Sequence, residues 1–167
     1  MHPFPHHYDV VSTAAPQGDI ILESRGLPPL TTATPPEFDG PGGRWSPETL
    51  LVAAVADCFL LTFRGIAKAS SLPWFSVTVE VTGTLERPDR VSRFTRFDIR
   101  ARLILEPDVS EARARRILMR AEETCLITRS MSGEAHLDIE ILRTGQRQGV
   151  PTIPVAEPED RPQPVTR

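Results

Sequence analysis

One apolar helix constrains the fold of this chain more than any other segment. Ser46, Pro47 and Glu48 form a strong helix start, because Ser is a good N-cap, Pro suits the first helical position and an acid favours the positive end of the helix dipole. The helix predicted from Pro47 to about Ala69 is apolar on nearly every face, and such a helix must be covered on every face. One sheet of a 167-residue chain covers only part of it. We therefore expect a second chain to cover the rest.

The segments before this helix predict two short strands and a loop. Residues 8–14 and 19–24 have strand character, and residues 16–18 between them have the chemistry of a hairpin turn. Residues 25–44 contain two Pro-Pro pairs and a glycine-rich end, which favour a loop.

The segments after the helix predict a hairpin, a second helix and a last strand. Residues 75–86 and 94–105 alternate apolar and polar side chains, as half-buried strands do, and their short link indicates an antiparallel pair. Ser110 caps the predicted second helix, and residues 135–142 alternate again. This order predicts an α+β domain with an antiparallel sheet and two main helices.

The ends of the chain look different from this domain. Residues 1–7 carry three histidines and are predicted to be a flexible leader, followed by the domain at 8–144. Residues 145–167 hold five prolines and no periodic apolar face, which is typical of a disordered tail.

Composition excludes several classes of function. The net charge of −3 argues against nucleic-acid binding, which needs a basic surface to neutralise phosphates. The apolar run from Leu50 to Phe63 carries Asp57 and indicates a buried helix rather than a membrane span. Two cysteines without an export signal favour reduced thiols in the cytoplasm.

The two cysteines are the candidate reactive groups. Cys58 lies in the apolar helix, and Cys125, 67 residues later, ends the apolar stripe of the second helix. Both helices must pack into one core, so the two thiols can meet, and Cα atoms within about 4.4–6.8 Å permit a disulfide. A cysteine in an apolar helix is also consistent with inert packing. No ligand spacing indicates a metal site.

The residues around both cysteines resemble the OsmC/Ohr family of organic hydroperoxide-resistance proteins. Residues 46–59 (SPETLLVAAVADCF) are similar to the first-cysteine helix of that family, residues 33–43 (ATPPEFDGPGG) to its lead-in, and residues 125–130 (CLITRS) to the start of its second-cysteine segment. The resemblance extends over about 8–143. It implies an intertwined homodimer with its active sites at the interface.

The resemblance also implies a mechanism and a cellular role in the stress response. The Cys58 thiolate attacks the O–O bond of an organic hydroperoxide and becomes a sulfenic acid. Cys125 then forms a disulfide with Cys58, and a dithiol reductant, lipoyl-based in the family, restores both thiols. No cofactor is implied.

This chemistry needs a cation beside Cys58, because burial in apolar surroundings raises the pKa of a thiol. The family supplies an arginine held by a glutamate, and the glutamate corresponds to Glu48. Ten helical residues span about 15 Å, so Glu48 cannot reach Cys58 of its own chain. It can reach Cys58 of a second chain if the two helices pack antiparallel.

The arginine is the point at which this chain departs from the family. Gln17 stands at the corresponding position, and residues 8–22 contain no arginine. Arg25 and Arg44 flank the following loop and are candidate replacements.

Three phenylalanines are candidates for an apolar pocket that suits an organic peroxide, although core packing explains them as well. They are Phe38, Phe59 and Phe63. The sequence thus predicts a cytoplasmic thiol peroxidase. Two alternatives stay open: a non-catalytic dimer of the same fold that binds a small apolar ligand, and a thiol redox sensor.

Overall fold

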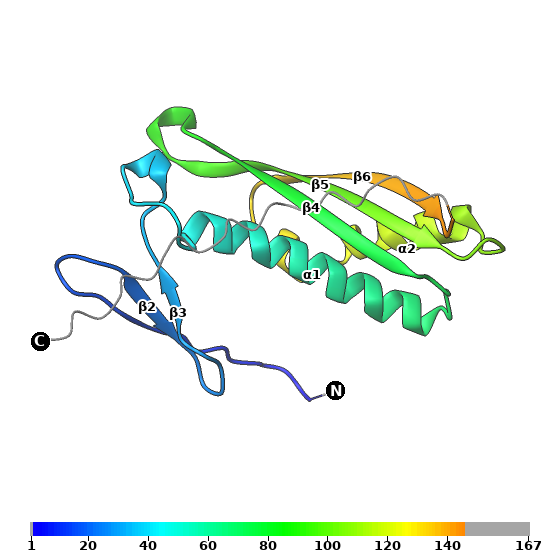
Figure 1. Ribbon diagram of the computed structural model, residues 1–167, viewed down its shortest axis with the longest axis horizontal. Helices are drawn as coiled ribbons and strands as arrows, with labels where there is room; N and C mark the ends of the chain where they lie inside the picture. Colours follow the sequence, from blue (N-terminus) through cyan, green and yellow to red (C-terminus); the bar gives the residue numbers. More distant parts are fainter. Residues whose placement is uncertain (1, 146–167) are drawn as a thin grey trace, which may run out of the picture.

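A computed structural model describes residues 2–145 of the chain, so the predicted proline-rich tail lies, apart from Gly145, outside the described residues. The elements follow the predicted order (Figure 1). They are β1 (Val11–Thr13), β2 (Ile20–Glu23), β3 (Leu30–Thr32), the 3-10 turn η1 (Pro36–Phe38), α1 (Pro47–Ala69), β4 (Ser76–Glu86), the turn η2 (Pro88–Arg90), β5 (Arg93–Leu105), α2 (Glu111–Glu123), α3 (Leu126–Arg129) and β6 (Glu134–Arg143).

The larger sheet has the order β4-β5-β6 and lies over the helices (Figure 1). Strands β4 and β5 form the predicted antiparallel hairpin, with a register shift between Thr84 and Leu85. Strand β6 instead runs parallel to β5, so the sheet is mixed rather than wholly antiparallel. The reason is the connection: α2 and α3 cross back along the sheet, and parallel neighbours need such a crossover.

The smaller sheet, β1-β2-β3, is antiparallel and lies away from the larger one, at the N-terminal half of α1 (Figure 1). Strand β3 falls inside the segment that the sequence predicts to be a loop. It has only three residues between two Pro-Pro pairs, too few to show an alternating pattern. A bridge from Thr32 to Trp45 attaches β3 to the start of α1.

Helix α1 begins where the sequence predicts. The Ser46 hydroxyl accepts a hydrogen bond from the Thr49 backbone N–H at 3.2 Å, and the Thr49 hydroxyl accepts one from the Ser46 N–H at 2.8 Å. This capping box satisfies two backbone donors that the first turn would otherwise leave free. Its buried stripe then repeats every four residues and packs on the sheet and α2 as the centre of the core; the stripe consists of Val55, Phe59, Phe63 and Ala67.

The rest of α1 is only partly covered by its own chain. Leu61, for example, is 54% exposed. Within residues 2–145, α1 is the one helix that is long and apolar enough to cross a membrane by length and composition, but the core helix of a soluble protein passes the same test. The buried stripe against the sheet is the packing of a core helix. Its uncovered side holds exposed Leu61 and half-buried Leu50 and Leu60. The charged side chains of Asp57, Arg64 and Lys68 are exposed on the same helix.

Candidate functional site

The fold brings the two cysteines together. Cys58 lies half-buried in the middle of α1, and Cys125 is fully buried just after α2, as the N-cap of α3. Helix α1 packs against both α2 and α3. Burial raises the pKa of the Cys125 thiol, and the neighbouring Cys58 side chain raises it further by hydrogen bonding and by its charge. Both cysteines are free thiols.

Thr128 is the polar residue that supports Cys125. Its side chain is buried, and its hydroxyl donates to the Cys125 carbonyl oxygen at 3.1 Å. The neighbouring Thr128 lowers the pKa of the Cys125 thiol, against the larger effect of burial, although the Cys125 side chain makes no capping hydrogen bond to α3. The sequence analysis missed Thr128. The available signal was a hydroxyl residue three positions after a residue that caps a short helix.

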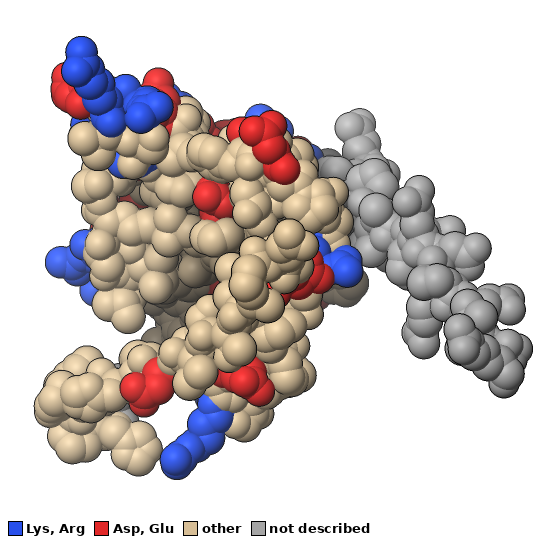
Figure 2. Space-filling model, turned by 90° about the vertical axis from the view of Figure 1, so that its left-hand side faces the viewer, with Lys and Arg blue, Asp and Glu red and all other residues tan. Residues whose placement is uncertain are grey.

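An apolar pocket of about 310 Å³ lies at the end of the molecule where α1 begins. Its walls come from η1, the first turns of α1 and the adjoining ends of β4 and β5. Figure 2 faces this end and shows a largely uncharged central surface. The lining residues are Pro35, Glu37, Phe38, Ser46, Glu48, Thr49, Val52, Gly83, Leu85 and Phe94.

The three phenylalanines expected at the pocket divide between two places. Phe38 lines the pocket, whereas Phe59 and Phe63 are fully buried in the core and do not line it. Their positions four residues apart on α1 direct both toward the sheet. Val52 and Phe94 take their place in the pocket wall and were not singled out in the sequence, because only the folded hairpin brings Phe94 to α1.

Glu48 lies in the first turn of α1 and lines this pocket. Its Oε2 atom is buried and has no hydrogen-bond partner among residues 2–145. A buried carboxylate oxygen without a partner is costly. In the described part of the single chain, Glu48 Oε2 therefore lacks the donor or cation that would compensate for its burial.

Neither of the two candidate arginines supplies this donor or cation. Arg44 is exposed, with its Nε 3.1 Å from Asp19 Oδ2, and donates to the Gly43 carbonyl oxygen at 3.1 Å. It thus ties the turn between β1 and β2 to the segment before α1. Arg25 is exposed in the turn after β2. Neither arginine lines the pocket, and neither is bonded to the Glu48 Oε2 atom.

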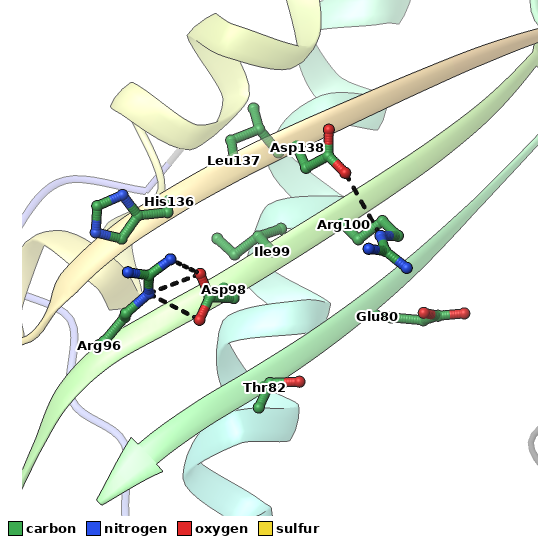
Figure 3. A pocket seen from close by; sticks show the side chains of 9 residues that line it. All are labelled: Glu80, Thr82, Arg96, Asp98, Ile99, Arg100, His136, Leu137 and Asp138. Atoms are coloured by element: carbon green, nitrogen blue, oxygen red, sulfur yellow. Dashed lines mark hydrogen bonds and ion pairs between the residues drawn. The ribbon is translucent and has the colours of Figure 1, made fainter. Parts of the chain in front are cut away.

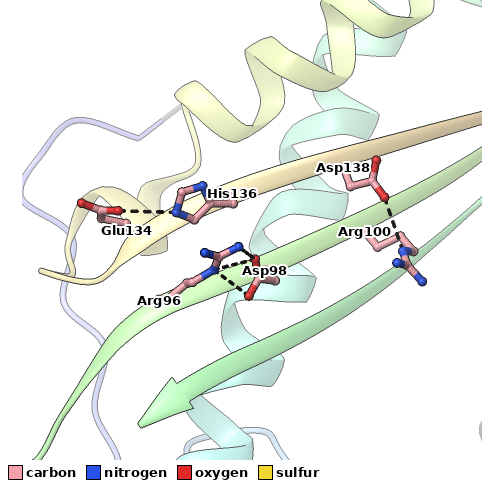
Figure 4. A network of polar contacts seen from close by, with 6 residues as sticks. All are labelled: Arg96, Asp98, Arg100, Glu134, His136 and Asp138. Atoms are coloured by element: carbon pink, nitrogen blue, oxygen red, sulfur yellow. Dashed lines mark hydrogen bonds and ion pairs between the residues drawn. The ribbon is translucent and has the colours of Figure 1, made fainter. Parts of the chain in front are cut away.

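A second, polar groove of about 510 Å³ lies on the opposite face of the larger sheet, away from the helices (Figure 3). Its charges are paired across and along the strands (Figure 4). Arg96 Nε donates to both carboxylate oxygens of Asp98 at 2.7 and 2.8 Å and lowers the pKa of that carboxyl, and Arg100 lies 3.5 Å from Asp138. Neither cysteine lines this groove or the apolar pocket beside Glu48, so neither cavity of the single chain contains a reactive thiol.

The arrangement thus defines a class of protein: an α+β fold with two adjacent thiols, one of them partly accessible, and an apolar pocket beside a glutamate whose buried Oε2 has no partner in the described part of the chain. Residues 40–140 match the family model described as OsmC-like protein. The chain belongs to this OsmC-like family, which confirms the resemblance seen in the sequence.

Individual relatives are distant in sequence. The chain is 25% identical over 138 residues to the uncharacterized protein YmaD of Bacillus subtilis (strain 168), a match that covers 81% of this chain and 92% of that protein. Among solved structures, an OsmC-like protein of unknown function from Vibrio cholerae superposes with a TM-score of 0.75 at 18% identity, covering 81% of this chain and 99% of that one. An organic hydroperoxide resistance protein OsmC from Legionella pneumophila gives 0.65 at 21% identity, covering 83% and 99%. These likenesses establish the fold.

Proposed function

We propose that this protein is a thiol peroxidase that reduces organic hydroperoxides. The observation that carries the proposal is the meeting of Cys58 and Cys125 in an OsmC-like fold, with Cys58 partly exposed and Cys125 buried. Solved structures of the same fold include proteins named for organic hydroperoxide resistance. The Cys58 thiolate attacks the peroxide O–O bond, an alcohol leaves, and Cys58 becomes a sulfenic acid.

Cys125 completes the proposed cycle. Its thiol attacks the sulfenic sulfur of Cys58, water leaves, and a disulfide forms. A dithiol reductant then returns both cysteines to thiols. The apolar pocket supports an organic rather than a small polar peroxide, because its wall of Phe38, Val52 and Phe94 favours hydrocarbon.

We further propose that the active unit is a homodimer. On α1, Leu61 is exposed and other apolar side chains such as Leu50 and Leu60 are only half-buried, and the small sheet makes its main contacts only within itself. The buried Oε2 of Glu48, which has no partner among the residues that the structure describes, supports the same arrangement, since a second chain can bring a donor to it. Antiparallel packing of two α1 helices would place Glu48 of one protomer near Cys58 of its partner, as the family resemblance implies.

The pocket also supports a second candidate function, a dimer that binds a small apolar ligand without catalysis. Of the arginines in residues 2–145, none lines the pocket, and Arg44 is paired with Asp19 instead. Without a cation, Cys58 would react slowly with peroxide.

One experiment separates these functions. The protein is mixed with an alkyl hydroperoxide and dihydrolipoamide, and peroxide consumption is compared for the wild type, Cys58→Ser and Cys125→Ser. If the protein is a peroxidase, we expect the wild type to consume peroxide with turnover and Cys58→Ser to be inactive. We expect Cys125→Ser to form a sulfenic acid at Cys58 but no disulfide. If the wild type consumes no peroxide and mass spectrometry finds both thiols free, the peroxidase proposal fails. If all three proteins then bind an apolar fluorophore equally, the ligand-binding function stands.

A further inference from the structure

A glycine stands in the wall of the apolar pocket, where β4 passes the first turns of α1 (Figure 1). This residue, Gly83, lies inside β4 and lines the pocket together with Val52 of α1 and Phe94 of β5. Glycine weakens the interior of a strand, because it offers no side chain to pack and loses more conformational freedom on folding than other residues. A glycine at this position therefore needs a physical reason.

The reason at Gly83 is space. Its φ does not lie in the left-handed region, so the backbone conformation does not require glycine. A Cβ atom at this position would lie 2.7 Å from Val52 Cγ2 and 2.8 Å from Phe94 Cε1. Carbon atoms in favourable contact are about 3.5–4.0 Å apart, so both distances are too short. Gly83 thus allows these two side chains to close directly onto the backbone of β4.

Neither side chain can retreat easily into the core. Val52 is β-branched and lies in a helix, where one χ1 rotamer is strongly preferred. The Phe94 ring stacks on the Phe97 ring with 5.4 Å between centroids, and Phe97 is fully buried. Phe97 is itself tightly packed, since a Cβ atom at Gly133 would lie 2.9 Å from its Cε2 atom. The pocket that Val52 and Phe94 both line is therefore the open space into which they can move.

We propose that Gly83 is a specificity-determining residue: the room that it leaves at Val52 and Phe94 allows the pocket to take a bulky aromatic hydrocarbon, such as the cumyl group of a tertiary hydroperoxide. A pocket of about 310 Å³ is at the small end of the range for ligand sites, so one methyl group in its wall changes which hydrocarbons fit. Two aromatic residues, Phe38 and Phe94, stand in the wall and favour an aromatic ligand.

This inference rests on the proposed peroxidase function, which supplies the hydroperoxide, and it deepens that function by naming the hydrocarbon that the pocket selects. Neither cysteine of the same chain lines the pocket. In the proposed antiparallel dimer, the hydrocarbon lies in the pocket of one protomer beside Glu48, and the peroxide group meets the partner's Cys58.

Binding is tested first, without catalysis. The unreactive alcohol 2-phenyl-2-propanol carries the cumyl group and is titrated into the reduced protein, with binding followed by nuclear magnetic resonance. We expect Gly83→Ala to bind this alcohol at least about tenfold more weakly than the wild type, as a single methyl group in a tight apolar site can cause. The control, Thr82→Ala, changes the preceding residue of β4, which lines the polar groove on the opposite face, and should bind the alcohol like the wild type.

Val52→Ala changes the same corner of the pocket in the opposite direction, and it tests the inference even if Gly83→Ala does not fold. Loss of the two Val52 methyl groups widens the pocket. We therefore expect the affinity for the larger 2-(2-naphthyl)-2-propanol, relative to 2-phenyl-2-propanol, to rise at least about threefold.

Peroxide consumption gives the second readout. With dihydrolipoamide as the reductant, kcat/KM is measured for cumene hydroperoxide and for the smaller tert-butyl hydroperoxide, and Gly83→Ala is expected to lower the ratio of the two at least about tenfold. Unchanged alcohol binding in a folded Gly83→Ala protein, or an unchanged preference in Val52→Ala, overturns the inference. If alcohol binding changes as expected but the wild type consumes neither peroxide, the peroxidase proposal fails alone and the role of Gly83 in ligand selection stands.

Discussion

At the scale of single residues, the two cysteine thiols of this chain lie in different environments. Cys125 is fully buried and its pKa is raised by that burial, whereas Cys58 is partly accessible on a helix. The sequence predicts the candidate pair, because each cysteine ends or interrupts an apolar stripe. It does not predict Thr128, whose hydroxyl donates to the Cys125 carbonyl oxygen only after the chain has turned into α3.

Glu48 offers a prediction at this scale. Replacing it by Gln removes a carboxylate whose Oε2 is buried and unpaired in the described chain. If a cation of the dimer partners this group beside Cys58, Glu48→Gln lowers kcat/KM for an alkyl hydroperoxide by at least about tenfold, which is about 1.4 kcal/mol. The thermal unfolding midpoint of the dimer is expected to fall, because the partnering cation then loses its carboxylate.

The matched control is Glu37→Gln, an exposed acid that lines the same pocket. It is expected to leave kcat/KM within about twofold of the wild type. Equal losses in the two variants would show that general pocket charge, rather than Glu48 itself, governs the reaction.

At the scale of elements, local patterns located the helices and the long strands. The boundaries of α1 agree with the prediction because its start signal and its apolar run lie within the helix itself. Strand β3 and helix α3 were missed, since three and four residues are too short to show periodicity. The parallel pairing of β6 was also missed, because the register of β6 depends on how α2 and α3 cross the sheet.

The capping box of α1 gives a prediction for this scale. Ser46 is buried and exchanges hydrogen bonds with Thr49. Ser46→Ala is expected to lower the free energy of unfolding by about 1 kcal/mol, as loss of an N-cap does. Urea denaturation monitored by circular dichroism measures the change. Ser132→Ala, at an exposed position outside the helices, serves as the control and should change stability by less than about 0.5 kcal/mol.

At the scale of the whole molecule, residues 2–145 leave apolar side chains uncovered, which supports the proposed dimer. The outer face of α1 and the small sheet both lack a partner layer within the described residues. Exposed apolar patches of this kind mark association surfaces. The sequence already predicted that a second chain packs on α1, and the structure shows which side of the helix its own chain does not cover.

Leu61 lies on the uncovered side of α1, and its substitution tests the proposed dimer. Leu61→Glu places a charge in the proposed interface, and we expect it to convert the dimer to a monomer at micromolar concentration in analytical ultracentrifugation. Thr82→Glu adds the same charge on the opposite face of the larger sheet, where side chains are exposed, and should leave the dimer intact. A Leu61→Glu protein that sediments like the wild type would contradict an interface at this face.

The sequence by itself determined the long helix, the alternating strands and the two cysteines as the reactive candidates, because caps and periodicity act between residues close in the chain. Only the tertiary structure decided that Cys58 is partly exposed and Cys125 is buried, and that Phe38 lines a pocket while Phe59 and Phe63 fill the core. It also decided that the Glu48 Oε2 has no hydrogen-bond partner within residues 2–145. Each of these depends on which distant segments pack together. Burial and pairing are properties of that packing, and a local pattern does not contain them.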